Sequence, residues 1–160
     1  MHCVHNLQSL IGGGLVSLLL FGTSIAADSL SATLPDGTEI ARFEIPEGEG
    51  WCVLWHHSVQ GFEVSDCYEN RAGDMVLVKS HLPDFAAGLG HIPERGRQVS
   101  DGAGGYWILD LDEPVTGNAY ILRPGLGRVN HRIQVGSRTV SLSAIAPRAR
   151  VRIALGHREH

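Results

Sequence analysis

The chain has 160 residues, of which 43% are hydrophobic and 19% charged, and its formal net charge at pH 7 is -4. This length suits one domain with a substantial hydrophobic core, and the negative charge argues against a strongly basic nucleic-acid-binding protein. The charge is unevenly distributed, because residues 1–113 contain 16 acidic and 5 basic residues and residues 114–160 contain 1 and 8. We expect the two halves to neutralise each other in one folded body; a basic surface reserved for an anion or a partner is the alternative.

The first segment of the chain predicts export. Residues 10–25 form an apolar run, and Ser24-Ile25-Ala26 fits a signal-peptidase site, so we expect a signal peptide over residues 1–26. The run is short for a bilayer span, but no Lys or Arg precedes it, which leaves retention as a membrane anchor as the alternative. Either way we expect a periplasmic or otherwise extracytoplasmic domain over residues 27–156 and a disordered tail over 157–160. Membrane contact is expected only if the signal segment is retained.

Strands are expected on both sides of a central hairpin, each bounded by Gly, Pro, Asn or Asp. They cover residues 31–34, 38–45, 75–82, 106–111, 119–123, 131–135, 139–142 and 150–155. Residues 83–105 contain six glycines and no sustained period, and such a long irregular stretch in a compact domain is typically functional. No segment of the mature chain has a convincing helical pattern. The spacing predicts an all-β fold: a single-domain antiparallel β-sandwich or barrel of about 8–10 short strands.

The central hairpin covers residues 51–68, which hold two of the three tryptophans and two of the three cysteines. If its loop has four residues, Ser58 to Gly61, then His57 pairs with Phe62. One side of this hairpin is then mainly apolar. The other side carries Cys52, Leu54, His56, Glu63, Ser65 and Cys67.

The hairpin register decides whether the cysteines can meet. The four-residue loop sets Cys52 directly opposite Cys67, whereas a two-residue turn at Gln60-Gly61 leaves them diagonal. Cys3 would be lost with the signal, so an even number remains in an oxidising compartment. We therefore prefer the first register and expect a Cys52–Cys67 disulfide, with two separate core residues as the alternative.

Two short motifs are similar to those of a known family. His57-Ser58-Val59 follows an aromatic strand, Phe85-Ala86-Ala87-Gly88 lies in the following loop, and a strand opens at His131. Over about residues 43–155 this pattern resembles the bacterial family called domain of unknown function 1850. The resemblance implies a small exported domain, often encoded beside tripartite ATP-independent periplasmic (TRAP) transporters of the TAXI type, and no activity. The sequence departs from the family's usual residues at Gln60, Asp66 and Ala86.

The histidine–serine pair of the first motif invites a nucleophile interpretation. Adjacent strand residues point to opposite faces, however, so His57 and Ser58 cannot easily share a proton, and Ser58 is expected to cap the turn. His57 falls on the apolar face beside Asp66, where it is either a satisfied core group or the floor of a pocket. An acid–base centre of His57, Asp66 and His131 is the enzymatic alternative, and it requires the three side chains to converge in one cleft.

Two glycine-rich segments are candidate anion sites. Neither Gly88-Leu89-Gly90 nor residues 123–128 follows a strand and opens a helix, so neither is a phosphate loop. Arg123 and Arg128 flank a tight turn, which is expected to be a hairpin turn with solvated arginines; binding of a carboxylate by the two guanidiniums is the alternative.

The last strand is expected to carry Arg148, Arg150 and Arg152 on one face. Such a stripe usually protects a sheet edge from other chains, and it could also meet an acidic partner or anionic lipid headgroups. No histidine or cysteine spacing predicts a metal site, and no cofactor is expected.

The sequence favours a non-enzymatic extracytoplasmic binding or accessory module, linked by the resemblance to TAXI-type solute uptake. Its expected contact surface is the His57 region with the loop over residues 84–97. Expected partners are a TAXI-type solute-binding protein or a TRAP membrane subunit, with a small carboxylate as a further ligand. Expected binding residues are His57, Ser58, Phe85, Gly88, Gly90, Arg123, Arg128 and His131. A small hydrolase-like enzyme is the alternative.

Overall fold

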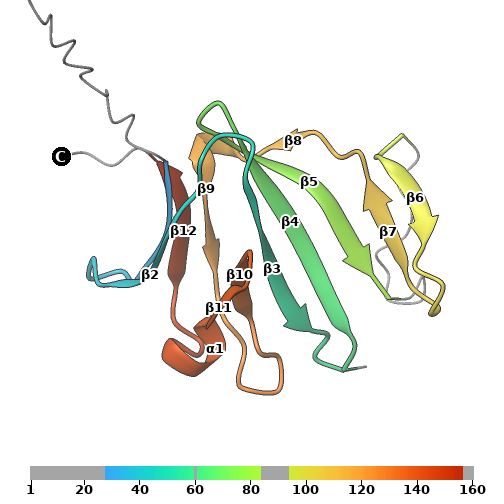
Figure 1. Ribbon diagram of the computed structural model, residues 1–160. Helices are drawn as coiled ribbons and strands as arrows, with labels where there is room; N and C mark the ends of the chain where they lie inside the picture. The colour runs from blue at the N-terminus through green and yellow to red at the C-terminus, as the bar shows by residue number, and fades with distance from the viewer. Residues whose placement is uncertain (1–27, 60, 84–93, 157–160) are drawn as a thin grey trace, which may run out of the picture.

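Two antiparallel β-sheets pack face to face in the computed structural model, which describes residues 28–59, 61–83 and 94–156 (Figure 1). Every strand pair is antiparallel, and the fold is nearly all β. The predicted all-β sandwich is therefore confirmed. The predicted signal segment, Phe85, Gly88, Gly90 and the predicted tail lie outside the described residues.

The smaller sheet has the strand order β2-β1-β12-β9. Its strands are β1 (Ser29–Thr33), β2 (Glu39–Glu44), β9 (Ala119–Leu122) and β12 (Val151–Gly156). The first two are joined at the predicted turn, where the Leu34 N–H donates to the Thr38 carbonyl at 2.9 Å and Gly37 has a φ of 87°. This positive φ explains why glycine follows Pro35-Asp36.

The larger sheet has the order β11-β10-β3-β4-β5-β7-β6, with β8 beside β5. Its strands are β3 (Gly50–His56), β4 (Glu63–Arg71), β5 (Asp74–Leu82), β6 (Arg97–Ser100), β7 (Tyr106–Leu109), β8 (Glu113–Pro114), β10 (Arg132–Val135) and β11 (Arg138–Ser141). Only part of this larger sheet can face the smaller sheet, because it has more strands. The β5–β7–β6 side extends beyond it (Figure 1).

The predicted register of the central hairpin is confirmed. Cys52 lies opposite Cys67, and the two form a disulfide. The His57 N–H donates to the Phe62 carbonyl at 2.8 Å, and the Gly61 N–H donates to the His57 carbonyl at 2.9 Å. The loop therefore has four residues, as the alternation of cysteine and aromatic positions predicts.

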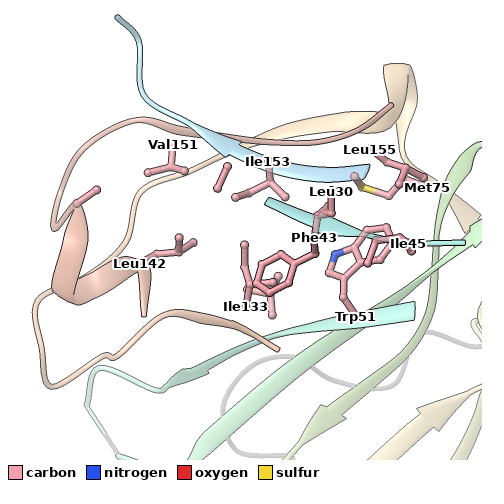
Figure 2. Packing of buried hydrophobic residues seen from close by; sticks show 13 residues of the cluster. Leu30, Phe43, Ile45, Trp51, Met75, Ile133, Leu142, Val151, Ile153 and Leu155 are labelled. Carbon is pink, nitrogen blue, oxygen red and sulfur yellow. The ribbon is translucent and has the colours of Figure 1, made fainter. Parts of the chain in front are cut away.

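The main core lies between the sheets, where alternate residues of each strand point inward (Figure 2). Leu30, Phe43 and Ile153 from the smaller sheet are at most 2% exposed, as is Trp51 from the larger one. A second buried cluster covers the extended part of the larger sheet. It consists of Val64, Leu82, Tyr106, Ile108 and Leu111.

Four elements were not expected from the sequence: β6, β8, the 3-10 helix η2 (Thr116–Asn118) and helix α1. β6 lies within the segment predicted to be irregular, and it exists because its backbone pairs with β7, from Arg97 opposite Leu109 to Ser100 opposite Tyr106. Helix α1 (Leu142–Ile145) is a single turn, capped by the Ser141 hydroxyl, which accepts from the Ala144 N–H at 3.2 Å. β6 and α1 have four residues each, and β8 and η2 have two and three, so all four are too short for a side-chain period to reveal.

The expectation of an arginine stripe along the last strand is wrong. β12 begins at Val151, and Arg148 sits in the preceding connection with a φ of 64°, so only Arg152 belongs to the strand. β12 is also not an edge, because it lies between β1 and β9. In the described part of the chain, no helix is long and apolar enough to cross a bilayer.

Candidate functional site: a groove on the disulfide face

The outer side of the larger sheet, called here the disulfide face, brings polar side chains from several strands together. The strand registers form two rows across it. The first row is Gln134, Cys52, Cys67 and Lys79. The second row is Arg132, Leu54, Ser65, His81 and Trp107.

A groove with a volume of about 550 Å³ crosses this face. Leu54, Ser65 and the disulfide line it, together with Lys79, His81 and Trp107. Ser65 is only 7% exposed, and its hydroxyl makes no hydrogen bond within the described part of the chain. The groove therefore combines an apolar floor with a hydroxyl that a ligand can reach.

One wall of the groove is organised around Trp107. The His81 ring centroid lies 4.6 Å from that of Trp107, and Lys79 Nζ lies 5.3 Å from the Trp107 ring centroid. Lys79 forms no ion pair with any described residue, so its ammonium is available to an anion.

Asp101 holds the His81 ring in place. Its Oδ2 lies 2.8 Å from His81 Nε2, while its Oδ1 accepts from the N–H groups of Ala103 and Gly105 at 2.8 and 2.9 Å. The backbone bond from Ala103, followed by the bond from His81, lowers the pKa of Asp101. A Cβ at Gly105 would lie 2.4 Å from Asp101 Oδ2, so only glycine permits this close turn.

The opposite wall carries a second charge pair. Arg132 donates to the Glu63 carboxylate, and His56 Nε2 lies 3.9 Å from Glu63. Glu63 is thus paired with Arg132, and Glu69, which also lines the groove, lies 3.5 Å from Arg71, so among the described lining residues Lys79 is the unpaired charge.

Asp66 faces the sandwich interior, on the side opposite the groove. Its Oδ1 accepts from the Ser80 hydroxyl at 2.6 Å. Burial raises the pKa of this carboxyl, and the Ser80 hydrogen bond opposes that rise. Nearby, the Arg95 guanidinium binds Glu113 through two hydrogen bonds of 2.6 and 3.0 Å.

The histidines of the alternative acid–base centre have other neighbours. His131 Nδ1 accepts from the Gly125 N–H at 3.0 Å, and its ring stacks on Trp55 with 5.8 Å between centroids. Burial lowers the pKa of His131. The His57 ring lies 5.1 Å from the Phe62 ring, and Ser58 is exposed. The hydrogen bonds described for Asp66 and His131 are thus made to Ser80 and to the backbone of Gly125, and neither joins these two side chains to each other.

Arg123 and Arg128 are exposed on the connection between β9 and β10. These strands belong to different sheets, so the connection crosses the sandwich and the predicted hairpin turn is wrong. The Gly125 N–H within it is already bonded to His131.

Sequence reasoning placed Leu54, Ser65 and the cysteines on one face but missed Lys79, His81 and Trp107 as their neighbours. The alternation along β5 puts Lys79 and His81 on one face. Their position beside Trp107 depends on the pairing of β5 with β7, which the alternation does not specify. Among the described residues, no three His, Cys, Asp or Glu side chains gather as metal ligands.

Comparison with known proteins gives one match. Residues 52–142 match the family described as Domain of unknown function (DUF1850). No curated protein and no solved structure matches the chain.

Proposed function

Because the chain belongs to the DUF1850 family, we propose that it is a non-enzymatic extracytoplasmic module that binds its partner or ligand at the disulfide-face groove. It acts in TAXI-type TRAP solute uptake, where it is an accessory of the solute-binding protein or of the membrane subunit. The family resemblance supports this association. The disulfide supports an oxidising compartment, because such bonds persist outside the cytoplasm.

The groove is the observation that carries the proposal. It crosses strands that a covalent bond and continuous backbone pairing hold in one geometry, so little ordering is required on binding. Its walls offer Trp107 as a flat apolar contact, Lys79 as an unpaired cation and Ser65 as a hydroxyl. Apolar surface with a few polar groups is typical of binding sites.

The experiment is co-purification of the tagged chain with a TAXI-type solute-binding protein from the native envelope. Lys79→Glu reverses the groove charge without removing a packed ring, so we expect recovery of the partner to fall severalfold. Thr116→Glu introduces a carboxylate at an exposed position that does not line the groove, and it should leave recovery unchanged.

Two results would count against the proposal. Absence of association at native expression levels would remove the link to solute uptake. Equal recovery by Lys79→Glu and the wild type would show that the groove is not the contact surface.

An acid–base enzyme using His57, Asp66 and His131 is the second candidate. One observation favours it: burial raises the pKa of Asp66, as it does for carboxyls that act as general acids. Hydrolysis of p-nitrophenyl acetate by the wild type that Asp66→Asn abolishes, at equal folded content, would support this candidate over the first.

A further inference from the structure

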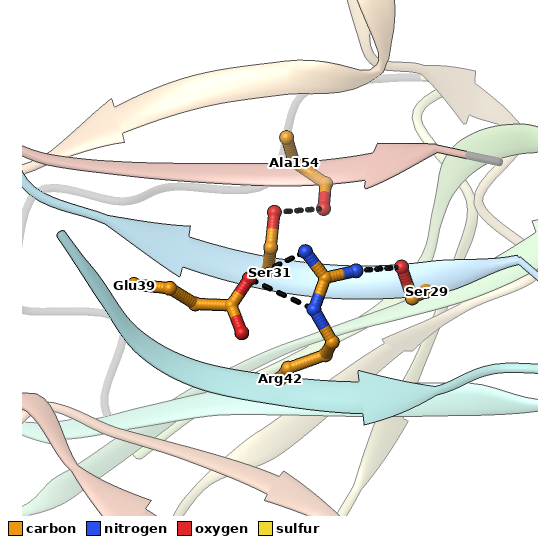
Figure 3. Close-up of polar contacts among 5 residues, drawn as sticks. All are labelled: Ser29, Ser31, Glu39, Arg42 and Ala154. Atoms are coloured by element: carbon orange, nitrogen blue, oxygen red, sulfur yellow. Dashed lines mark hydrogen bonds and ion pairs between the residues drawn. The ribbon is translucent and has the colours of Figure 1, made fainter. Parts of the chain in front are cut away.

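The arginines of the described residues fall into two groups by their surroundings. In the first group, each guanidinium has a partner: Arg42 with Glu39, Arg71 with Asp112, Arg95 with Glu113, Arg97 with Asp110 and Arg132 with Glu63. Arg138 lies 4.8 Å from the centroid of the Phe43 ring. Figure 3 shows the typical case, in which Arg42 donates to the carboxylate of Glu39 and to the Ser29 hydroxyl.

The second group, called here the arginine patch, consists of Arg123, Arg128, Arg148, Arg150 and Arg152. All five are exposed, and none of their guanidiniums forms an ion pair or hydrogen bond with a described residue. Residues 114–156 contain no Asp or Glu, so no carboxylate of this half can neutralise them. Of the ion pairs between described residues, only that of Arg132 with Glu63 joins the two halves.

The fold brings four of these arginines, Arg123, Arg148, Arg150 and Arg152, to one end of the smaller sheet, and Arg128 follows on the connection after β9. Arg152 pairs with Ile121 across β12 and β9, and Val151 pairs with Leu122, so Arg150 and Arg123 are the residues that adjoin this last pair. The Arg148 N–H donates to the carbonyl of Pro124 at 2.7 Å, so the connections before β12 and after β9 are joined at this end of the sheet.

Chain stability does not explain this arrangement. Like charges that lie near one another repel, and elsewhere this protein pairs its arginines with carboxylates. Two exposed apolar side chains lie beside these arginines: Ile121, which pairs with Arg152, is 50% exposed, and Leu126, between Arg123 and Arg128 in the sequence, is 46% exposed. Cationic side chains with exposed apolar groups between them are typical of a surface that a partner covers.

We infer that the arginine patch binds a carboxylate-rich segment of a partner protein. Guanidinium groups match carboxylates through paired hydrogen bonds. Arg150 and Arg152 are alternate residues, about 7 Å apart along an extended chain, which is also the spacing of alternate carboxylates on an extended acidic segment.

The geometry favours a protein over a bilayer. Ser29 pairs with Gly156, so residues before Asp28 join the domain at the far end of β12 from Arg150 (Figure 1). A membrane anchor in those residues would hold that end against the bilayer and leave the patch facing away. The patch also lies on the smaller sheet and its connections, whereas the groove lies on the larger sheet, so the two surfaces can be tested separately.

The test measures binding of a fluorescent hexaglutamate peptide to the full mature chain by anisotropy at low ionic strength. We expect binding that weakens as salt is added. The double variant Arg150→Gln/Arg152→Gln should bind about tenfold more weakly, as expected for the loss of two exposed ion pairs. Arg42→Gln removes one charge from the smaller sheet at a guanidinium that Glu39 already pairs, and it should bind like the wild type.

Binding of the patch to a lipid surface is the other outcome, and it is tested with vesicles of phosphatidylcholine with and without phosphatidylglycerol. Sedimentation with the anionic vesicles and no hexaglutamate binding would overturn the inference and assign the patch to a lipid surface. Hexaglutamate binding that the double variant retains, or no binding to either probe, would also overturn it. Thermal unfolding of each variant confirms that it is folded.

Discussion

Two half-buried side chains, Asp66 and His131, make the stability of the fold depend on pH, and their pKa values shift in opposite directions. Burial raises the pKa of Asp66 above its ordinary value of 3.8 and lowers that of His131 below 6.5. In both cases the folded state favours the uncharged form, since little water is present to solvate the charge. Each can be tested with a substitution of nearly the same shape.

For Asp66, the folded state holds the proton more tightly than the unfolded state does. The contribution to stability is therefore complete below about pH 3.8 and is lost as pH rises through the folded pKa. Asp66→Asn keeps a neutral group beside Ser80, so its free energy of unfolding should lack this decline. Urea unfolding from pH 4 to 8 measures it, and parallel profiles for wild type and variant would contradict the assignment.

For His131, protonation competes with a structural hydrogen bond. Nδ1 accepts from the Gly125 N–H, which requires the neutral ring, so stability is present above pH 6.5 and is lost as pH falls through the folded pKa. Acidification should release the Gly125 amide, so its protection factor, which is the exchange rate corrected for the intrinsic effect of pH, should fall. The amide of Gly48, which donates to the Asn70 carbonyl, serves as the control. His131→Asn, which keeps an acceptor, should remove the pH response.

Among the elements, the central hairpin is the one that the sequence specifies best. The positions of Cys52 and Cys67 select one loop length, and the observed pairing of every residue from Gly50 with Glu69 to His56 with Glu63 follows from it. The disulfide closes a segment with a sequence separation of 15.

Removing the disulfide should therefore lower the free energy of unfolding, mainly because the unfolded chain gains conformational entropy. For a loop of this size the chain-entropy estimate is about 3 kcal/mol. Cys52→Ser/Cys67→Ser should lower the free energy of unfolding by about that amount, and reduced wild type should match it. Equal stability of the oxidised, reduced and substituted proteins would contradict a structural role for this bond.

Other elements show where prediction from sequence stops. The turn at Pro35-Asp36-Gly37 was predictable because its residues carry the required backbone angles. β6 and the position of Trp107 were not, because they depend on which strand pairs with β5 and β7, and many pairings satisfy the same alternation. The groove was missed for this reason, although Leu54 and Ser65 were placed on its face.

For the whole molecule, the decisive feature is the position of the last strand. The sequence predicted an all-β sandwich, but it suggested that the arginine-bearing strand was an edge. β12 instead joins β1 to β9, and its Ile153 and Val151 are fully buried in the core.

A chain ending at residue 150 should therefore fail to fold, because β1 and β9 lose their common neighbour. A chain ending at residue 156 keeps β12 and should unfold at the same temperature as the full chain. Circular dichroism and thermal unfolding compare the two. A folded chain ending at 150 would show that the larger sheet is stable without the smaller one.

The pairing of Ser29 with Gly156 also determines how the domain responds to force. The start of β1 and the end of β12 lie side by side, so a force that pulls Ser29 and Gly156 apart would break the β1–β12 hydrogen bonds one after another. It would not load all of these bonds at once, as shear along the strands would. Pulled in this direction, the protein should yield at low force. The larger sheet, with its covalent bridge, should open last.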